Sequence, residues 1–115
     1  MYRVFYYTMA RGENPVQDFV DSLDDLTQAR FFAYVDMLKE YGPNLKRPYA
    51  DIVQGKILEI RPRQARVLYF FAVGNRIILV HGFLKKRDAI HPKDIALAES
   101  RFQDWMQRNI GRRSL

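Results

Sequence analysis

The order of sequence patterns predicts an α+β domain. It would hold a small antiparallel sheet with an N-terminal strand, a helical hairpin packed on one face, and a C-terminal helix. Residues 2–8 are rich in aromatic and β-branched side chains and predict the first strand. Two segments with apolar residues at helical spacing follow, and three strand-like runs lie between Gly55 and Arg87. All 115 residues fit a single domain of this kind, with residues 111–115 as a frayed tail.

Two helices are predicted after the first strand. Asn14 suits an N-cap, Pro15 suits the first helical position, and Gln17 can close a capping box. The apolar side chains of this helix, which should end near residue 23, are Val16, Phe19, Val20 and Leu23. The apolar stripe of the second helix is Leu26, Ala29, Ala33, Met37 and Tyr41. Asp24 or Asp25 can cap the second helix, and the short connection predicts an antiparallel helical hairpin.

The rest of the sheet is predicted after a loop over residues 44–54. The three strands span Lys56–Arg61, Arg66–Val73 and Arg76–Leu84, and Gly74-Asn75 signals a tight turn. Long apolar runs in the last two strands indicate one covered face and a second face that is also well packed. The final helix begins at His91-Pro92 and ends at Gly111. Its apolar stripe is Ile95, Ala98, Phe102 and Trp105.

Positive charge is concentrated in the predicted sheet. The net charge is +6, yet residues 13–59 hold five basic and nine acidic residues. Residues 61–87 hold no acidic residue and seven basic ones, which are Arg61, Arg63, Arg66, Arg76, Lys85, Lys86 and Arg87. A sheet with a purely cationic rim is typical of a surface that binds a polyanion.

Composition also excludes several classes of site. The chain has no cysteine, so it can form neither disulfides nor a thiolate metal site. It has no HExxH motif, glycine-rich phosphate loop or acidic cluster at metal spacing, so we expect no metal and no cofactor. No apolar run reaches the length of a membrane span, and the N-terminus does not resemble a signal peptide. These features predict a soluble protein of the cytoplasm.

Arg61 and Arg66 flank a four-residue connection, so a hairpin would place them opposite each other on one face. Opposed like charges destabilise a sheet by roughly 0.2–1 kcal/mol. A phosphate between the two guanidinium groups would remove that cost, because arginine binds phosphate through two hydrogen bonds. The structural alternative is that Glu59, two residues before Arg61, neutralises one arginine. Both interpretations stay open.

The triplet Lys85-Lys86-Arg87 follows the last strand, which should lie beside the strand that carries Arg66. A basic triplet in a loop is usually just solvated, but here it could converge with the two arginines. His91 borders this loop and either caps the final helix or acts as a general acid or base. His81 and Tyr69 lie in apolar strands and are predicted core residues.

The segments GKILEIRPRQARVLYFF and HGFLKK resemble the RelE/ParE toxin superfamily, most closely its HigB-like branch with phage-derived Gp49-like proteins. Further matches are PVQDFVDSL, YGPNLKRPY and the pattern P-K-x-x-I-x-x-A at the start of the last helix. The matches span nearly the whole chain in the family's order. The resemblance implies a RelE-like toxin that is neutralised by a cognate antitoxin, expected to be a helix-turn-helix protein of HigA type.

The resemblance also implies an activity and its residues. Nuclease members of the superfamily enter the ribosomal A site and cut mRNA without a metal, which inhibits translation. In them the 2′-OH attacks the adjacent phosphate and leaves a 2′,3′-cyclic phosphate and a 5′-OH. By position, the catalytic candidates are Arg61, Arg66 and Lys86, with His91 as a loosely matched acid or base. The RNA-binding candidates are Lys46, Arg47, Arg63, Arg76, Lys85 and Arg87.

Two other functions remain open at this point. ParE-like relatives share the fold, inhibit DNA gyrase by binding it, and lack nuclease activity. The paired arginines and the following lysines favour the nuclease over this alternative. A non-catalytic RNA-binding module would bind RNA in a strongly salt-dependent manner without cleaving it.

Overall fold

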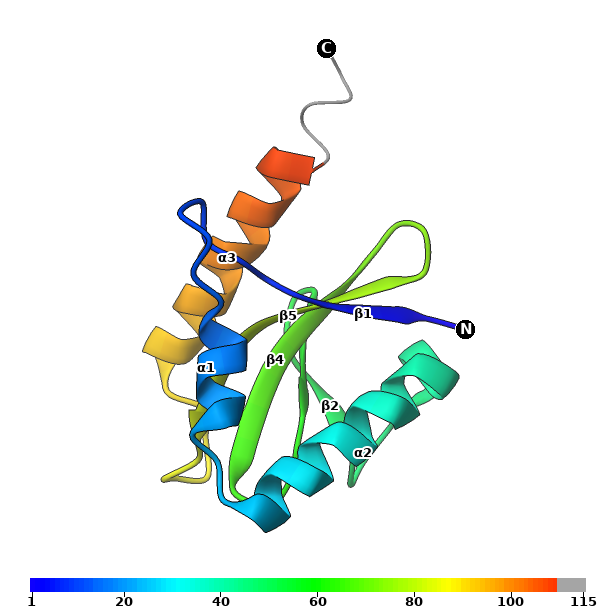
Figure 1. Cartoon of the computed structure of the whole chain (residues 1–115), viewed down its shortest axis with the longest axis vertical. Helices are drawn as coiled ribbons and strands as arrows, with labels where there is room; N and C mark the ends of the chain where they lie inside the picture. Colours follow the sequence, from blue (N-terminus) through cyan, green and yellow to red (C-terminus); the bar gives the residue numbers. More distant parts are fainter. Residues whose placement is uncertain (110–115) are drawn as a thin grey trace.

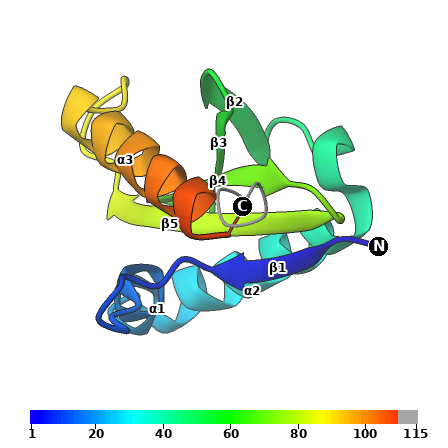
Figure 2. The same ribbon diagram turned by 90° about the horizontal axis from the view of Figure 1, so that it is seen from above.

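The computed structural model describes residues 1–109 as a five-stranded sheet with helices on both faces (Figures 1 and 2). The elements, in chain order, are β1 (Arg3–Tyr6), α1 (Pro15–Asp21), α2 (Asp25–Tyr41), the short 3₁₀ helix η1 (Gly42–Asn44), β2 (Ala50–Gln54), β3 (Ile57–Ile60), β4 (Ala65–Ala72), β5 (Arg76–Leu84) and α3 (Pro92–Asn109). The predicted α+β class is confirmed. The expected helix end at Gly111 and the expected tail lie outside the described residues.

The sheet is mixed rather than wholly antiparallel. Its strand order is β1-β5-β4-β3-β2, and β1 runs parallel to β5 with Val4 beside Ile77. The other three strand pairs are antiparallel. A hairpin forces neighbouring strands to be antiparallel, but β1 and β5 are joined through all the intervening elements and are free of that constraint.

The prediction of a loop over residues 44–54 is wrong in its second half, because residues 50–54 form β2, the outer strand of the sheet. β2 pairs with β3, with Ala50 opposite Ile60 and Ile52 opposite Leu58. The side chain of Ile52 is 67% exposed, and the pairing register shifts just after it. A short edge strand with an exposed apolar residue does not show the alternation by which a half-buried strand is recognised.

Two apolar cores lie on opposite faces of β4. On one face α1 and α2 pack on the sheet, with Val16, Val20, Phe31, Leu38, Val67, Tyr69 and Leu79 fully or almost fully buried. On the other face Ala98 and Trp105 of α3 pack against Leu68, Phe70 and Ile78. Figure 2 shows the two helical layers with the sheet between them. The predicted dense packing of the apolar strands is therefore confirmed, and of the predicted stripe of the final helix Ala98, Phe102 and Trp105 pack in this core.

The predicted caps of α1 and α2 are present, with one difference. The side chain of Asn14 accepts the backbone N–H of Gln17 at 3.1 Å, and that of Asp24 accepts the N–H of Thr27 at 2.8 Å. The side chain of Gln17 does not close a capping box but donates to Asp21 at 2.8 Å. The α1 helix ends at Asp21, two residues before the expected end, and α1 and α2 splay apart from their connection (Figure 1).

The predicted apolar stripe of α2 is not its buried face. Leu26 and Tyr41 are 52% and 48% exposed. The residues that pack on the sheet are Thr27, Phe31, Tyr34, Val35 and Leu38. Both sets have helical spacing, so periodicity alone cannot choose between them. Burying the set with Phe31 and Tyr34 removes more apolar area from water than burying a set rich in alanine.

No helix within residues 1–109 is long and apolar enough to cross a bilayer.

Candidate functional site

The register of β4 and β5 brings the predicted site residues to one end of the sheet. Arg66 lies opposite Phe83 and Ala65 opposite Leu84, so the start of β4 meets the end of β5. The backbone N–H of Lys85 donates to the carbonyl of Gln64 at 2.7 Å, which holds the basic triplet against the connection between β3 and β4. The predicted convergence of the triplet with the two arginines is present.

Three adjoining cavities mark this end of the molecule. One of about 220 Å³ is lined by Arg47, Glu59, Arg61, Arg66, Lys85, Asp88 and Ile90. A second of about 370 Å³ is lined by Arg63, Gln64, Arg66, Lys85, Lys86, Arg87 and Asp88. We call these two together the basic cleft. A third cavity of about 510 Å³, here called the adjoining pocket, is lined by Phe83, Leu84, Lys85, Lys86, Arg87, Ala89, His91, Lys93 and Asp94.

Arg66 is the most constrained cation of the basic cleft. Only 7% of the residue is exposed, and its Nη1 donates to the carbonyls of Arg63 and Ala65, both at 2.8 Å. Burial lowers the pKa of Arg66, and the nearby Glu59 carboxylate opposes that shift. The guanidinium stays charged at neutral pH because the ordinary pKa of arginine is so high. The fold thus presents a fixed planar cation to the cleft.

Glu59 lies between the two arginines. Its Oε1 is 3.6 Å from Nε of Arg66, and its Oε2 is 3.8 Å from Nη1 of Arg61. Both distances exceed that of a good hydrogen bond. The side chain is only 9% exposed, and within residues 1–109 its Oε1 is the one buried side-chain polar atom without a hydrogen-bond partner. Burial raises the pKa of Glu59, while Arg61 and Arg66 act in the opposite direction.

This carboxylate is the residue that sequence reasoning undervalued. The structural alternative placed Glu59 beside one arginine, but it faces both. Its position two residues before Arg61, on the same face of β3, was visible in the sequence. Its burial was not visible, because burial depends on the strands and the loop that surround it.

Arg47 and Arg61 both line the basic cleft, and both lie close to the carboxylate of Asp51 on β2. Nη2 of Arg47 is 2.7 Å from Oδ2 of Asp51, and Nη1 of Arg61 is 4.0 Å from the same oxygen. The hydrogen bond from Arg47 lowers the pKa of Asp51. Lys46, predicted beside Arg47, is exposed and lines none of the three cavities.

Arg63 and Arg76 lie at different ends of the sheet. Arg63 lines the basic cleft, and its Nε donates to Oγ1 of Thr27 at 3.1 Å. Arg76 begins β5, at the opposite end of that strand from Lys85. Its Nε donates to the carbonyl of Val73 at 2.8 Å, and its guanidinium lies 5.1 Å from the ring centre of Trp105. Arg76 therefore does not join the other RNA-binding candidates.

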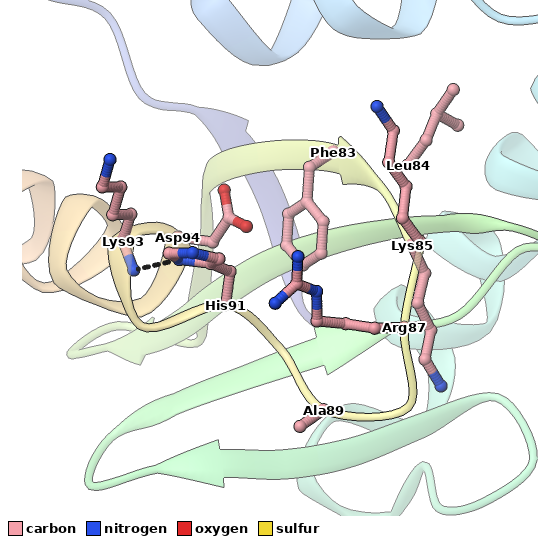
Figure 3. A pocket seen from close by; sticks show the side chains of 9 residues that line it. Phe83, Leu84, Lys85, Arg87, Ala89, His91, Lys93 and Asp94 are labelled. Carbon is pink, nitrogen blue, oxygen red and sulfur yellow. Dashed lines mark hydrogen bonds between the residues drawn. The ribbon is translucent and has the colours of Figure 1, made fainter.

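His91 occupies the adjoining pocket rather than the compartment with Arg61 and Glu59. Its Nδ1 accepts the backbone N–H of Lys93 at 3.0 Å, as Figure 3 shows, so it caps α3. Its Nε2 remains available for the pocket. His81 is half-buried, with Nε2 2.7 Å from Oδ1 of Asp94. Its half-buried position and its bond to Asp94 agree with the predicted semi-buried histidine, and burial lowers the pKa of His81.

The described residues include no group of three or more His, Asp or Glu side chains arranged to hold a metal ion. The basic cleft brings together several cations, the buried carboxylate of Glu59 and the exposed residue Asp88, and His91 lies in the adjoining pocket.

Comparison with known proteins assigns the chain to a family. Residues 18–103 match the family described as phage derived protein Gp49-like (DUF891). No curated protein matches the chain significantly. The matched segment contains Glu59, Arg61, Arg66, the basic triplet and His91. The chain belongs to the Gp49-like family, a family within the RelE-like toxin group.

Proposed function

We propose that the chain is the toxin of a type II toxin–antitoxin pair and that it cleaves mRNA in the ribosome without a metal. Membership in the Gp49-like family is consistent with a toxin that pairs with an antitoxin. The observation that carries the nuclease proposal is a single cavity lined by Arg61, Arg66 and Lys85, into which the buried carboxylate of Glu59 also faces. Within the superfamily we place the chain in the HigB-like branch, with a HigA-like antitoxin as its partner.

Positioning and charge stabilisation would come from the arginines. An RNA phosphate in the basic cleft would lie against Arg61 and Arg66, with Lys85 beside them. As the 2′ oxygen attacks phosphorus, negative charge grows on the non-bridging oxygens, and fixed cations stabilise that charge most strongly. Arg66 is already held by two backbone carbonyls, so little reorganisation is needed when the charge develops.

Proton transfer would involve Glu59. The carboxylate of Glu59, which lines the basic cleft, accepts the proton of the 2′-OH while the new bond from O2′ to phosphorus forms. The bond from phosphorus to O5′ then breaks, which leaves a 2′,3′-cyclic phosphate on one fragment. The departing 5′ oxygen takes a proton, for which Lys86 and His91 are the candidate donors, and becomes a 5′-OH. A carboxyl group with a raised pKa suits the role of base near neutral pH.

The direct test is to map the 5′ ends of cellular mRNA shortly after induction of the chain. We expect new 5′-OH ends within translated codons, and none when Arg66 is replaced by alanine. Arg76→Ala is the matched control: it also replaces an arginine by alanine, but at the end of β5 far from the cleft, and it should leave mRNA cleavage intact. A DNA-damage response with intact mRNA would instead indicate a ParE-like toxin that acts on gyrase. RNA binding without cleavage on translating ribosomes would indicate a non-catalytic RNA-binding module.

A further inference from the structure

We propose that the adjoining pocket binds a nucleobase of the RNA strand whose phosphate lies in the basic cleft, an inference that rests on the proposed function. The pocket lies between the end of β5 and the beginning of α3. Lys85, Lys86 and Arg87 line both the pocket and the basic cleft. A strand held by its phosphate in the cleft can therefore place the neighbouring base in the pocket.

One wall of the pocket suits a flat apolar ring. Phe83 is half-buried at the end of β5, and its ring centre lies 5.5 Å from that of His81, with the ring planes 31° apart. This contact fixes the orientation of Phe83. Figure 3 shows the guanidinium of Arg87 extending from the loop into the space that Phe83 faces. Stacking on an aromatic ring or a guanidinium plane is the common way in which proteins hold unpaired RNA bases.

His91 and Asp94, which also line the pocket, offer hydrogen bonds to the edge of a base (Figure 3). Nδ1 of His91 is occupied by the N–H of Lys93, so a neutral His91 carries its proton on Nε2 and can donate it. Oδ1 of Asp94 is bonded to His81, and Oδ2 has no hydrogen-bond partner among residues 1–109. Each nucleobase presents donors and acceptors side by side on its Watson–Crick edge, so this pair can serve any of the four bases.

The same features argue against a free phosphate as the occupant. The carboxylate of Asp94 would repel an anion, and the apolar surfaces of Phe83 and Leu84 would gain nothing from it. Three of the cations of the pocket, Lys85, Lys86 and Arg87, lie on the side shared with the basic cleft, whereas Lys93 lines the pocket alone. A nucleotide would match both features, because its phosphate could contact the lysines while its base packs against Phe83.

The test compares adenosine monophosphate with ribose 5-phosphate, which lacks the base, as ligands of the intact protein followed by NMR. Stacking worth about 1 kcal/mol or more predicts that adenosine monophosphate binds at least about fivefold more tightly. Phe83→Leu should abolish this difference and leave the affinity for ribose 5-phosphate unchanged. Phe5→Leu, on β1 outside the pocket, is the matched control and should retain the difference. A thermal melt of each variant verifies folding.

Equal affinities of the wild-type protein for the two ligands would overturn the proposal, as would a base-dependent difference that survives in Phe83→Leu. Neither result depends on RNA cleavage. If the chain is not a nuclease, the mapping of 5′ ends will show no cleavage. If the pocket does not bind a base, only the comparison of adenosine monophosphate with ribose 5-phosphate will show it.

Discussion

Arg66 and Glu59 place opposite charges in a nearly dry environment at one end of β4. Each is less than a tenth exposed, and neither could be buried alone without a large loss of solvation energy. Glu59 lies 3.6 Å from Arg66 and 3.8 Å from Arg61, so one carboxylate partly offsets two guanidinium charges without forming ideal hydrogen bonds. All three side chains line the same compartment of the basic cleft.

The first prediction concerns the geometry of Arg66. Arg66→Ala should lower the rate of mRNA cleavage by about 10²–10³, as expected when a donor to developing charge is removed. Arg66→Lys keeps the charge but loses the planar fork that binds the carbonyls of Arg63 and Ala65, so it should rescue little of the rate. Single-turnover cleavage by purified protein on programmed ribosomes measures both effects. Wild-type rates in a folded Arg66→Lys variant would contradict the fixed-cation role.

The second prediction concerns the pH dependence that Glu59 imposes. A base must be deprotonated to accept a proton, so activity should rise as pH rises through the pKa of Glu59. Burial raises that pKa above the ordinary 4.5, so the rising limb should lie at higher pH than for an exposed glutamate. Glu59→Gln keeps the shape of the side chain and should abolish this limb along with most of the activity. A pH–rate profile of Glu59→Gln that keeps the wild-type limb would assign the proton transfer to another group.

At the scale of elements, the site depends on where strands end and helices begin. The end of β5 supplies the basic triplet, and the beginning of α3 supplies His91 and Asp94. The bond between His81 and Asp94 ties α3 to β5 and sets the width of the pocket between them. Edge strand β2 adds Asp51, which orients Arg47 toward the cleft. No one element contains the site.

The third prediction tests which face of α2 is buried. Phe31 is fully buried between α2 and the sheet, so Phe31→Ala should lower the free energy of unfolding by about 3–5 kcal/mol. Leu26 lies on the stripe predicted from the sequence to be buried but is half-exposed, so Leu26→Ala should lower the free energy of unfolding by no more than about 1 kcal/mol. Urea denaturation of the two variants measures the difference. Equal losses of unfolding free energy in the two variants would mean that the predicted stripe is also packed against the rest of the protein.

At the scale of the whole molecule, acidic and basic residues are segregated along the sequence. The segment that forms the helical hairpin, η1, β2 and β3 is acidic, whereas the strands β4 and β5 and their loops are basic. The excess of positive charge around the basic cleft would favour the approach of a polyanion there. The same charges would favour an acidic segment of an antitoxin over the basic cleft.

The fourth prediction follows from this excess of positive charge. If two to four phosphates contact the basic cleft, the logarithm of RNA affinity should fall with the logarithm of salt concentration with a slope of roughly −1.5 to −3. Lys86→Ala should make the slope shallower by roughly 0.7, whereas Lys56→Ala, outside both compartments of the cleft, should leave it unchanged. Fluorescence anisotropy with a short single-stranded RNA measures these slopes. Identical slopes for the two variants would place the RNA elsewhere.

The sequence by itself determined the order of the main helices and strands apart from β2, the N-caps of α1 and α2, the core strands β4 and β5, and the group of cations around Arg61 and Arg66. These features depend on local spacing and composition, which a single chain displays directly. Tertiary structure decided the parallel pairing of β1, the edge strand β2 and the buried face of α2, because each depends on area buried against distant residues. It also separated Arg76 from the cluster and enclosed Glu59 between two guanidinium groups. The burial of Glu59 and its distances to the two guanidinium groups depend on the folded chain around it, so the local sequence cannot reveal them.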